Sequence, residues 1–198
     1  MSLWLKARAV PTVGLTAAGS LVALLLPFST LSATPSPGGA TIGLAVLLAL
    51  AMPVVLGWGM ARSDRDLEVL STRPVALLDF ALVLAAGVGV AAIEVLLRAT
   101  LSAPAGLIAG RAGATYVGLL LAAVPAVGWR NASTLPLTYF VAVVIAGRGT
   151  DAAHPAIWAW IASPEEEPIA MTAALLTLIG GAATYLRYRN RFSEWNRR

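Results

Sequence analysis

The sequence ARSDRDLEVLSTRP, residues 61–74, is the only dense mixture of charges that lies between two long apolar segments of this chain. Its fourteen positions hold three basic and three acidic side chains: Arg62, Arg65 and Arg73, with Asp64, Asp66 and Glu68. A short charged connection between two apolar runs is typical of a membrane protein, because the runs cross the bilayer and the connection lies in water.

The charged connection itself has the signals of a short helix. Ser63 followed by Asp66 resembles a capping box, in which both side chains accept hydrogen bonds from helix N–H groups. Pro74 cannot continue a helix from within, so the pattern predicts about two turns with Leu67 and Leu70 on one face. A helix of this length is unstable alone in water. We therefore interpret residues 61–74 as a cytoplasmic coupling element that docks on a partner or lies against a membrane surface.

The composition indicates an integral membrane protein of one domain. Of the 198 residues, 58% are hydrophobic and 12% are charged, which is about half the charged share of soluble proteins. Lipid can solvate an apolar outer face that water could not. The net charge of +4 is small and forms no basic stripe, so a nucleic-acid partner is not expected.

Six apolar segments predict an all-α fold with six transmembrane helices, at residues 10–28, 41–60, 75–97, 112–128, 132–146 and 168–185. The first segment has an alternative interpretation as a cleaved signal peptide. The fifth is short, which favours a tilted, re-entrant or bilayer-thinning segment. Residues 98–111 are interpreted as a connection, because Pro104, Gly106 and Gly110 interrupt the pattern.

The basic residues predict the orientation of these spans. With six spans both termini share one side, and that side receives eleven basic residues: Lys6, Arg8, Arg62, Arg65, Arg73, Arg130, Arg187, Arg189, Arg191, Arg197 and Arg198. The other side receives three: Arg98, Arg111 and Arg148. The positive-inside rule then predicts an interfacial N-terminal segment at 1–9, an extracellular loop at 147–167 and a basic cytoplasmic tail at 186–198.

The sequence lacks the patterns of several enzyme classes. Its single lysine, Lys6, and the absence of a GxxxxGK[ST] motif exclude a P-loop ATPase site in this chain. It has one histidine, His154, and no cysteine, so no zinc, haem or catalytic site is predicted. The consecutive carboxylates at 165–167 point in different directions on a helix and are interpreted as a solvated helix end rather than a calcium site.

Two acidic residues lie inside the third predicted span. Glu94 is followed by Arg98 four residues later, a favourable spacing for an ion pair within a helix. An intramembrane ion pair, a place in a substrate path and a proton-coupling role remain alternatives for Glu94. Asp79 lies near the cytoplasmic edge and is expected to snorkel or to pack against Arg73.

Small residues recur every fourth position at Gly106, Gly110 and Ala114. This spacing allows two helices to approach closely. Packing inside the bundle is the preferred interpretation, with dimerisation as the alternative.

Six short spans without a soluble domain, and the sequence DLEVLSTRP at residues 66–74, resemble the membrane subunits of type-2 ABC exporters (ABC-2 permeases), especially the small Ala-, Leu- and Gly-rich actinobacterial members. In that family an acidic–apolar stretch, a small residue and Arg-Pro occupy this connection. The Trp-containing loop at 156–160 and the short basic tail also fit. The chain departs from the family at Ala112, where an Asn commonly follows the arginine.

The resemblance implies a transport subunit rather than an enzyme. Two membrane subunits, either identical or different, would pair with two separate ABC ATPase subunits, which would bind ATP and Mg²⁺; no cofactor is expected in this chain. The expected docking residues are Ser63, Asp64, Arg65, Asp66, Leu67, Glu68 and Leu70. The protein would lie in the cell membrane as a multi-pass protein and export an amphipathic or hydrophobic cargo such as a peptide, an antibiotic or a lipid.

Two other classes of function remain open. One is an ATP-independent transporter or channel, although such a protein would be expected to bury more charge at mid-membrane than Glu94 and Asp79. The other is a membrane assembly protein or a membrane enzyme with an unrecognised site.

Overall fold

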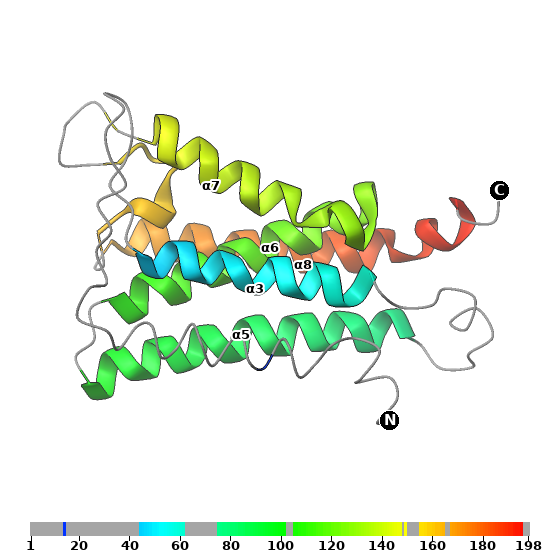
Figure 1. Cartoon of the computed structure of the whole chain (residues 1–198), viewed down its shortest axis with the longest axis horizontal. Helices are drawn as coiled ribbons and strands as arrows, with labels where there is room; N and C mark the ends of the chain where they lie inside the picture. Colours follow the sequence, from blue (N-terminus) through cyan, green and yellow to red (C-terminus); the bar gives the residue numbers. More distant parts are fainter. Residues whose placement is uncertain are drawn as a thin grey trace.

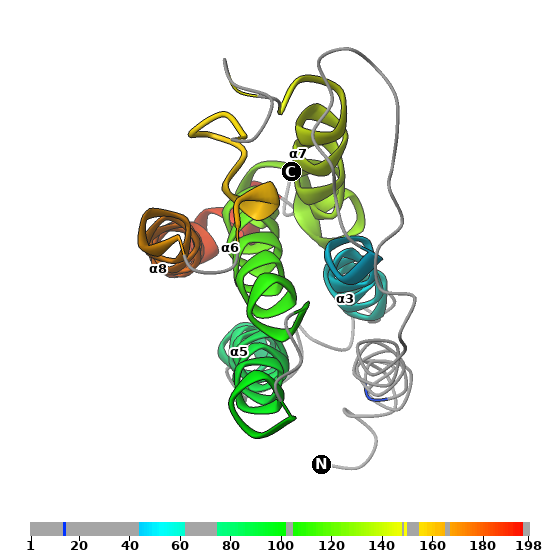
Figure 2. The same ribbon diagram turned by 90° about the vertical axis from the view of Figure 1, so that its left-hand side faces the viewer.

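Helix α6 (Ala105–Ala132) is the central element, because α8 (Pro168–Trp195), α3 (Leu44–Ala61) and α5 (Val75–Leu101) all pack against it (Figures 1 and 2). The remaining elements are α7 (Thr134–Ala146) and the short 3₁₀ helix η1 (Trp160–Ala162). The structure is a computed structural model that describes residues 44–61, 75–101, 105–147, 149, 155–164 and 167–195, together with Gly14.

The expected all-α class is confirmed for the part of the chain that the structure describes, in which nearly all residues are helical and no strand occurs. Two helical segments are long and apolar enough to cross a membrane, Leu107–Ala132 and Pro168–Tyr188. Val46–Ala61, Leu77–Ile93 and Thr134–Ala146 are shorter apolar helices. The first predicted span, at 10–28, and most of the coupling element, at 62–74, lie outside the described residues.

The helix boundaries differ from the predicted ones mainly around α6. Residues 98–111 were expected to form a broken connection, but α5 continues to Leu101 and α6 already begins at Ala105. Gly106 and Gly110 therefore lie inside a helix. A buried glycine in a helix weakens it by only about 1 kcal/mol relative to alanine, and the packing around α6 outweighs that. At the other end of the chain, α8 continues ten residues past the predicted end at Tyr185.

The end of the fourth predicted span is marked by one glycine. Gly128 has φ 73° and ψ 166°, which interrupts the helical backbone of α6. Positive φ is strained for side chains other than glycine. The last turn after this break places Trp129 against α3, where its carbonyl oxygen lies 3.3 Å from the position a Cβ would take at Gly57.

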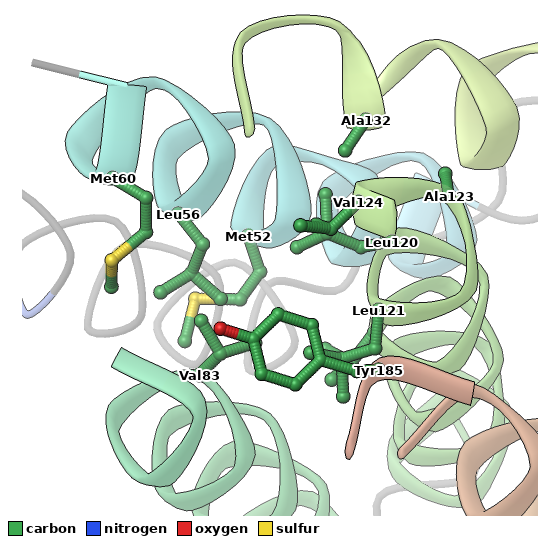
Figure 3. Close-up of a cluster of buried hydrophobic side chains, with 11 residues drawn as sticks. Met52, Leu56, Met60, Val83, Leu120, Leu121, Ala123, Val124, Ala132 and Tyr185 are labelled. Carbon is green, nitrogen blue, oxygen red and sulfur yellow. The ribbon is translucent and has the colours of Figure 1, made fainter. Parts of the chain in front are cut away.

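The larger hydrophobic core lies between α3, α5, α6 and α8 (Figure 3). Its fully buried side chains include Leu56 from α3, Val83 from α5 and Leu120 from α6. Tyr185 of α8 closes it by stacking on Phe80, with ring centroids 5.4 Å apart. This core joins four helices, so none of them packs as an isolated pair.

Helices α6 and α8 touch backbone to backbone. A Cβ added at Gly118 would lie 2.5 Å from the carbonyl oxygen of Thr177, and one at Gly181 would overlap the backbone of Gly118. Gly118 continues the four-residue spacing of Gly110 and Ala114 by one more turn, and all three are buried. This burial agrees with the interpretation of the small residues as packing inside the bundle.

Successive helices run in opposite directions along the bundle (Figure 1). As a result, Ala61 at the end of α3 and Val75 at the start of α5 lie at the same end as the turn between α6 and α7 and the C-terminal part of α8. The starts of α6 and α8 lie at the opposite end.

We predict that Gly118→Ala and Gly181→Ala each destabilise the protein by about 2–3 kcal/mol, because a methyl group cannot enter this backbone contact without separating the helices. Thermal unfolding in detergent, followed by circular dichroism, measures the effect.

The matched control is Gly180→Ala. Nothing lies within 4 Å of a Cβ at Gly180, so alanine there is expected to be neutral or to stabilise by up to about 1 kcal/mol. Equal melting temperatures for the Gly180 and Gly181 variants would show that α6 and α8 do not touch in this way.

Candidate functional site

Residues 155–164, here called the covering segment, fold back over the bundle at the end where α6 and α8 begin (Figure 2). Its η1 turn lies beside α6, between α7 and α8. Ala159 and Ile161 are fully buried, and Ser163 is nearly so. Residues 147–167 were expected to form a polar extracellular loop, and the described part of this loop packs three of its residues into the bundle while Ile157 stays exposed.

Arg111 of α6 anchors the end of the covering segment. Its guanidinium donates one hydrogen bond from Nη1 to the carbonyl oxygen of Pro164, at 3.0 Å, and a second from Nη2 to the carbonyl oxygen of Ser163. Only 1% of the residue is exposed. Arginine side chains in a helix point towards its N-terminus, which directs this one to the level where the covering segment meets α8.

Thr115, one turn after Arg111, holds the middle of the covering segment. Its hydroxyl donates to the carbonyl oxygen of Arg111 at 2.9 Å and accepts a hydrogen bond from the indole Nε1 of Trp160 at 3.1 Å. The Trp160 ring also contacts the Tyr139 ring of α7, at 5.5 Å between centroids. The Tyr139 hydroxyl donates to the carbonyl oxygen of Trp158 at 2.9 Å. Side chains from α6 and α7 thus bind this one segment along its length.

An apolar cluster lies beneath these contacts. It joins α3, α6, α7 and the covering segment through Val46, Ala49, Leu50, Ala112, Tyr116, Val143, Ala159 and Ile161. Tyr116 is fully buried, and its hydroxyl has no hydrogen-bond partner. A buried hydroxyl without a partner destabilises a fold by about 1–3 kcal/mol.

The charge on Arg111 is only partly compensated. The Nε–H group is buried and has no acceptor, and both acceptors of the other nitrogens are neutral carbonyls. Glu167, just before α8, exerts a favourable charge–charge interaction on Arg111. No ion pair to Arg111 is formed by the acidic residues that the structure describes. Buried arginine normally pairs with a carboxylate or a phosphate.

Most of the residues expected to be functional are not among the residues that the structure describes. The docking residues of the coupling element, Ser63 to Leu70, lie outside the described residues, and so do Arg73, His154, Glu165 and Glu166. Glu94 and Arg98 lie on α5, but their side chains are also outside the described set. Asp79 is buried on α5, with 3% of its surface exposed. Among the described residues, no group of three His, Cys, Asp or Glu side chains could hold a metal ion.

Arg111 was not predicted to be a site residue. It was assigned to an external connection, whereas the structure places it in the second turn of α6. The sequence did contain a signal for this position. Arg111 and Thr115 are four residues apart in a run of small and apolar residues, so they would share one face of a helix, and that face could be buried. The two carbonyl partners lie 52 and 53 residues away, and no local pattern predicts them.

Comparisons of the chain with protein-family models, with curated proteins and with solved structures found no match. A fold alone does not imply a function. The function is therefore inferred from residue chemistry and geometry.

We predict that Tyr116→Phe leaves the protein as stable as before or more stable by about 1 kcal/mol, because it removes a buried hydroxyl without a partner. The measurement is the thermal midpoint in detergent. A midpoint lowered by several degrees would instead indicate that the hydroxyl has an acceptor in the native protein.

Trp160→Phe is expected to destabilise the protein by about 1 kcal/mol, because it removes the hydrogen bond from the indole to Thr115. Trp158→Phe is the matched control, since the Trp158 ring is more exposed and its contact with Tyr139 involves only the backbone carbonyl. Proteolysis of the covering segment and the thermal midpoint should both separate the two variants. The hydrogen bond is refuted if they behave alike.

Proposed function

We propose that this protein is a multi-pass membrane subunit of an ABC-2 type exporter, driven by a separate ATPase and moving an amphipathic or hydrophobic substrate. The observation that carries the proposal is an apolar helix bundle in which the two helix ends flanking the charged connection lie at the basic end of the molecule.

The outer surface of α8 supports the membrane part of the proposal. Residues 168–186 contain no charged side chain, and Leu176 and Ile179 are 64% and 63% exposed. The candidate span of 21 residues in this helix is about 31 Å long at 1.5 Å per residue, close to the thickness of a bilayer core. Water would solvate this face poorly, whereas lipid would solvate it well.

The exposed threonines give independent support. The hydroxyls of Thr138, Thr172 and Thr184 each donate to the carbonyl oxygen four residues earlier. Such a bond satisfies a hydroxyl without water, as the interior of a bilayer requires.

The charge distribution supports a cytoplasmic location for the end that carries Ala61 and Val75. Arg130 is exposed in the turn between α6 and α7 at that end, and the basic C-terminal part of α8 begins there with Arg187. Arg111 is buried in a helix, so the opposite end has fewer basic loop residues than the sequence count assumed. Both observations favour the same orientation under the positive-inside rule.

A docking role for residues 63–70 follows from that orientation. In the sequence, Leu67 and Leu70 stand among charged residues, a composition suited to an interface with an apolar centre and a polar rim. The resemblance of residues 66–74 to the ABC-2 permeases supports an ABC ATPase as the docking partner. A second membrane subunit would complete the transporter.

An ATP-independent transporter is the second candidate, and Arg111 is the observation that favours it. Ionisable side chains buried within apolar helices often mark substrate or ion pathways. Such a transporter would function without any ATPase chain, which separates it from the first proposal.

The proposal predicts that an ATPase chain co-purifies with the tagged protein from its native membrane. Leu67→Asp should abolish co-purification, because a desolvated carboxylate is unfavourable in an apolar groove. The amount of the tagged chain in the membrane fraction should stay unchanged.

Asn131→Asp is the matched control. Asn131 is exposed in the turn between α6 and α7, so this variant adds the same charge at the same end of the bundle without altering the coupling element. Failure of any nucleotide-binding chain to appear with the unaltered protein would refute the exporter proposal. Equal loss of the ATPase in both variants would refute the docking role of Leu67.

A further inference from the structure

The guanidinium of Arg111 has binding capacity that the fold does not use. An arginine presents five N–H donors in a planar fork. Here two nitrogens donate to neutral backbone carbonyls, and the buried Nε–H has no acceptor. A carboxylate or phosphate would accept two parallel hydrogen bonds from Nε and a neighbouring nitrogen, each roughly twice as strong as a bond to a neutral acceptor.

We propose that Arg111 is the binding site for the carboxylate or phosphate group of an amphiphile, and that this group binds Nε and Nη2 and replaces the carbonyl of Ser163. This inference goes beyond the proposed exporter function and does not depend on an ATPase partner.

The surroundings of Arg111 favour an anion with an apolar body over a free inorganic ion. The next residue on α6, Ala112, belongs to the apolar cluster beneath the covering segment, and Ile108 packs against that cluster one turn earlier. The apolar part of a ligand can replace contacts made by Ile161 and Trp160. A small hydrophilic anion would gain no such contacts and would lose its hydration.

Binding at this site is coupled to the position of the covering segment. The carbonyl of Ser163 now accepts the hydrogen bond of Nη2, so an anion that binds Nε and Nη2 removes one of the two bonds by which Arg111 holds this end of the segment. A ligand that binds only the released state increases its population by a factor of about 1 + [L]/Kd. The fully buried Ile161 then becomes accessible.

Glu167 opposes the binding of an anion. Its charge interacts favourably with Arg111 and would repel a bound carboxylate or phosphate. Glu167→Gln should therefore tighten binding by roughly threefold to tenfold, in line with a charge–charge interaction of about 1 kcal/mol.

The first experiment measures equilibrium binding of labelled decanoate to the unaltered full-length chain in a nonionic detergent, with unlabelled decyl phosphate, methyl decanoate, acetate and inorganic phosphate as competitors. We expect saturable binding that decyl phosphate competes for and methyl decanoate does not. Arg111→Gln should abolish it, and Arg111→Lys, which keeps the charge but loses the fork, should weaken it by about tenfold or more.

The second experiment uses the absence of cysteine from the natural sequence. In an Ile161→Cys variant, decanoate at ten times its measured Kd should place most molecules in the released state and raise the rate of maleimide labelling by about tenfold or more. Ile157→Cys, at a position that is 81% exposed, should label at the same rate with and without decanoate. Arg130→Gln is the matched arginine control and should leave both the binding and the labelling unchanged.

The outcomes of these experiments show whether Arg111 binds an anion or only holds the covering segment in place. Absence of saturable decanoate binding, equal competition by methyl decanoate, or unchanged binding in Arg111→Gln would each overturn the proposal. Binding without increased labelling of the Ile161→Cys variant would overturn the coupling to the covering segment. Competition by acetate or inorganic phosphate at the concentrations effective for decyl phosphate would support the anion site and identify a free anion, rather than a lipid-like amphiphile, as its ligand.

Discussion

The backbone contact between Gly118 of α6 and Gly181 of α8 is the constraint on which the rest of the structure depends. The two helices run in the same direction, and each glycine lies thirteen residues after the first residue of its helix. The contact therefore brings the starts of α6 and α8 to the same level. The chain just before α8, which includes Ser163 and Pro164, must then lie beside the first turns of α6, where Arg111 can reach it. The contact between the two helices thus places Arg111 beside the carbonyls of Ser163 and Pro164.

The same contact explains how a buried charge is tolerated at this place. Arg111 is buried, and a buried guanidinium without acceptors would be very unfavourable. The covering segment offers carbonyl oxygens because η1 ends at Ala162 and leaves the carbonyls of the next two residues outside any helix. Carbonyls satisfy hydrogen bonds but supply no net negative charge. The arrangement is stable enough to keep the segment in place, yet a ligand with a full negative charge would bind the guanidinium more strongly.

Hydropathy predicted that α3, α5, α7 and α8 exist, because each is a long run of mostly apolar residues ended by Pro, Gly or charged residues. It also predicted the break at Gly128. The start of α6 was missed because Gly106 and Gly110 were interpreted as helix breakers, although small residues such as the buried Gly110 also allow close packing in a helix bundle. The role of Arg111 was missed for a different reason: counting basic residues in loops assigns each arginine to a connection. Its true partners depend on the covering segment folding back, which is a long-range event invisible to local periodicity.

Helix α6 also connects the two ends of the bundle. At one end, its last turn contacts α3 through the Trp129 carbonyl at Gly57, and the Trp129 ring packs against Tyr185 of α8, which stacks on Phe80 of α5. A force applied to the connection between α3 and α5 would therefore reach α6 and α8 together.

At the other end of the bundle, the same two helices hold the covering segment. Helix α6 binds it through Arg111, and α8 follows it in the chain. A small shift of α6 along α8 is resisted by the close contact at Gly118, so the pair would move as a unit relative to α7. Movement of α6 and α8 relative to α7 would stretch the hydrogen bond from Tyr139 of α7 to the Trp158 carbonyl. This bond is expected to break before the hydrogen bonds of Arg111, because Arg111 moves with α6 and α8.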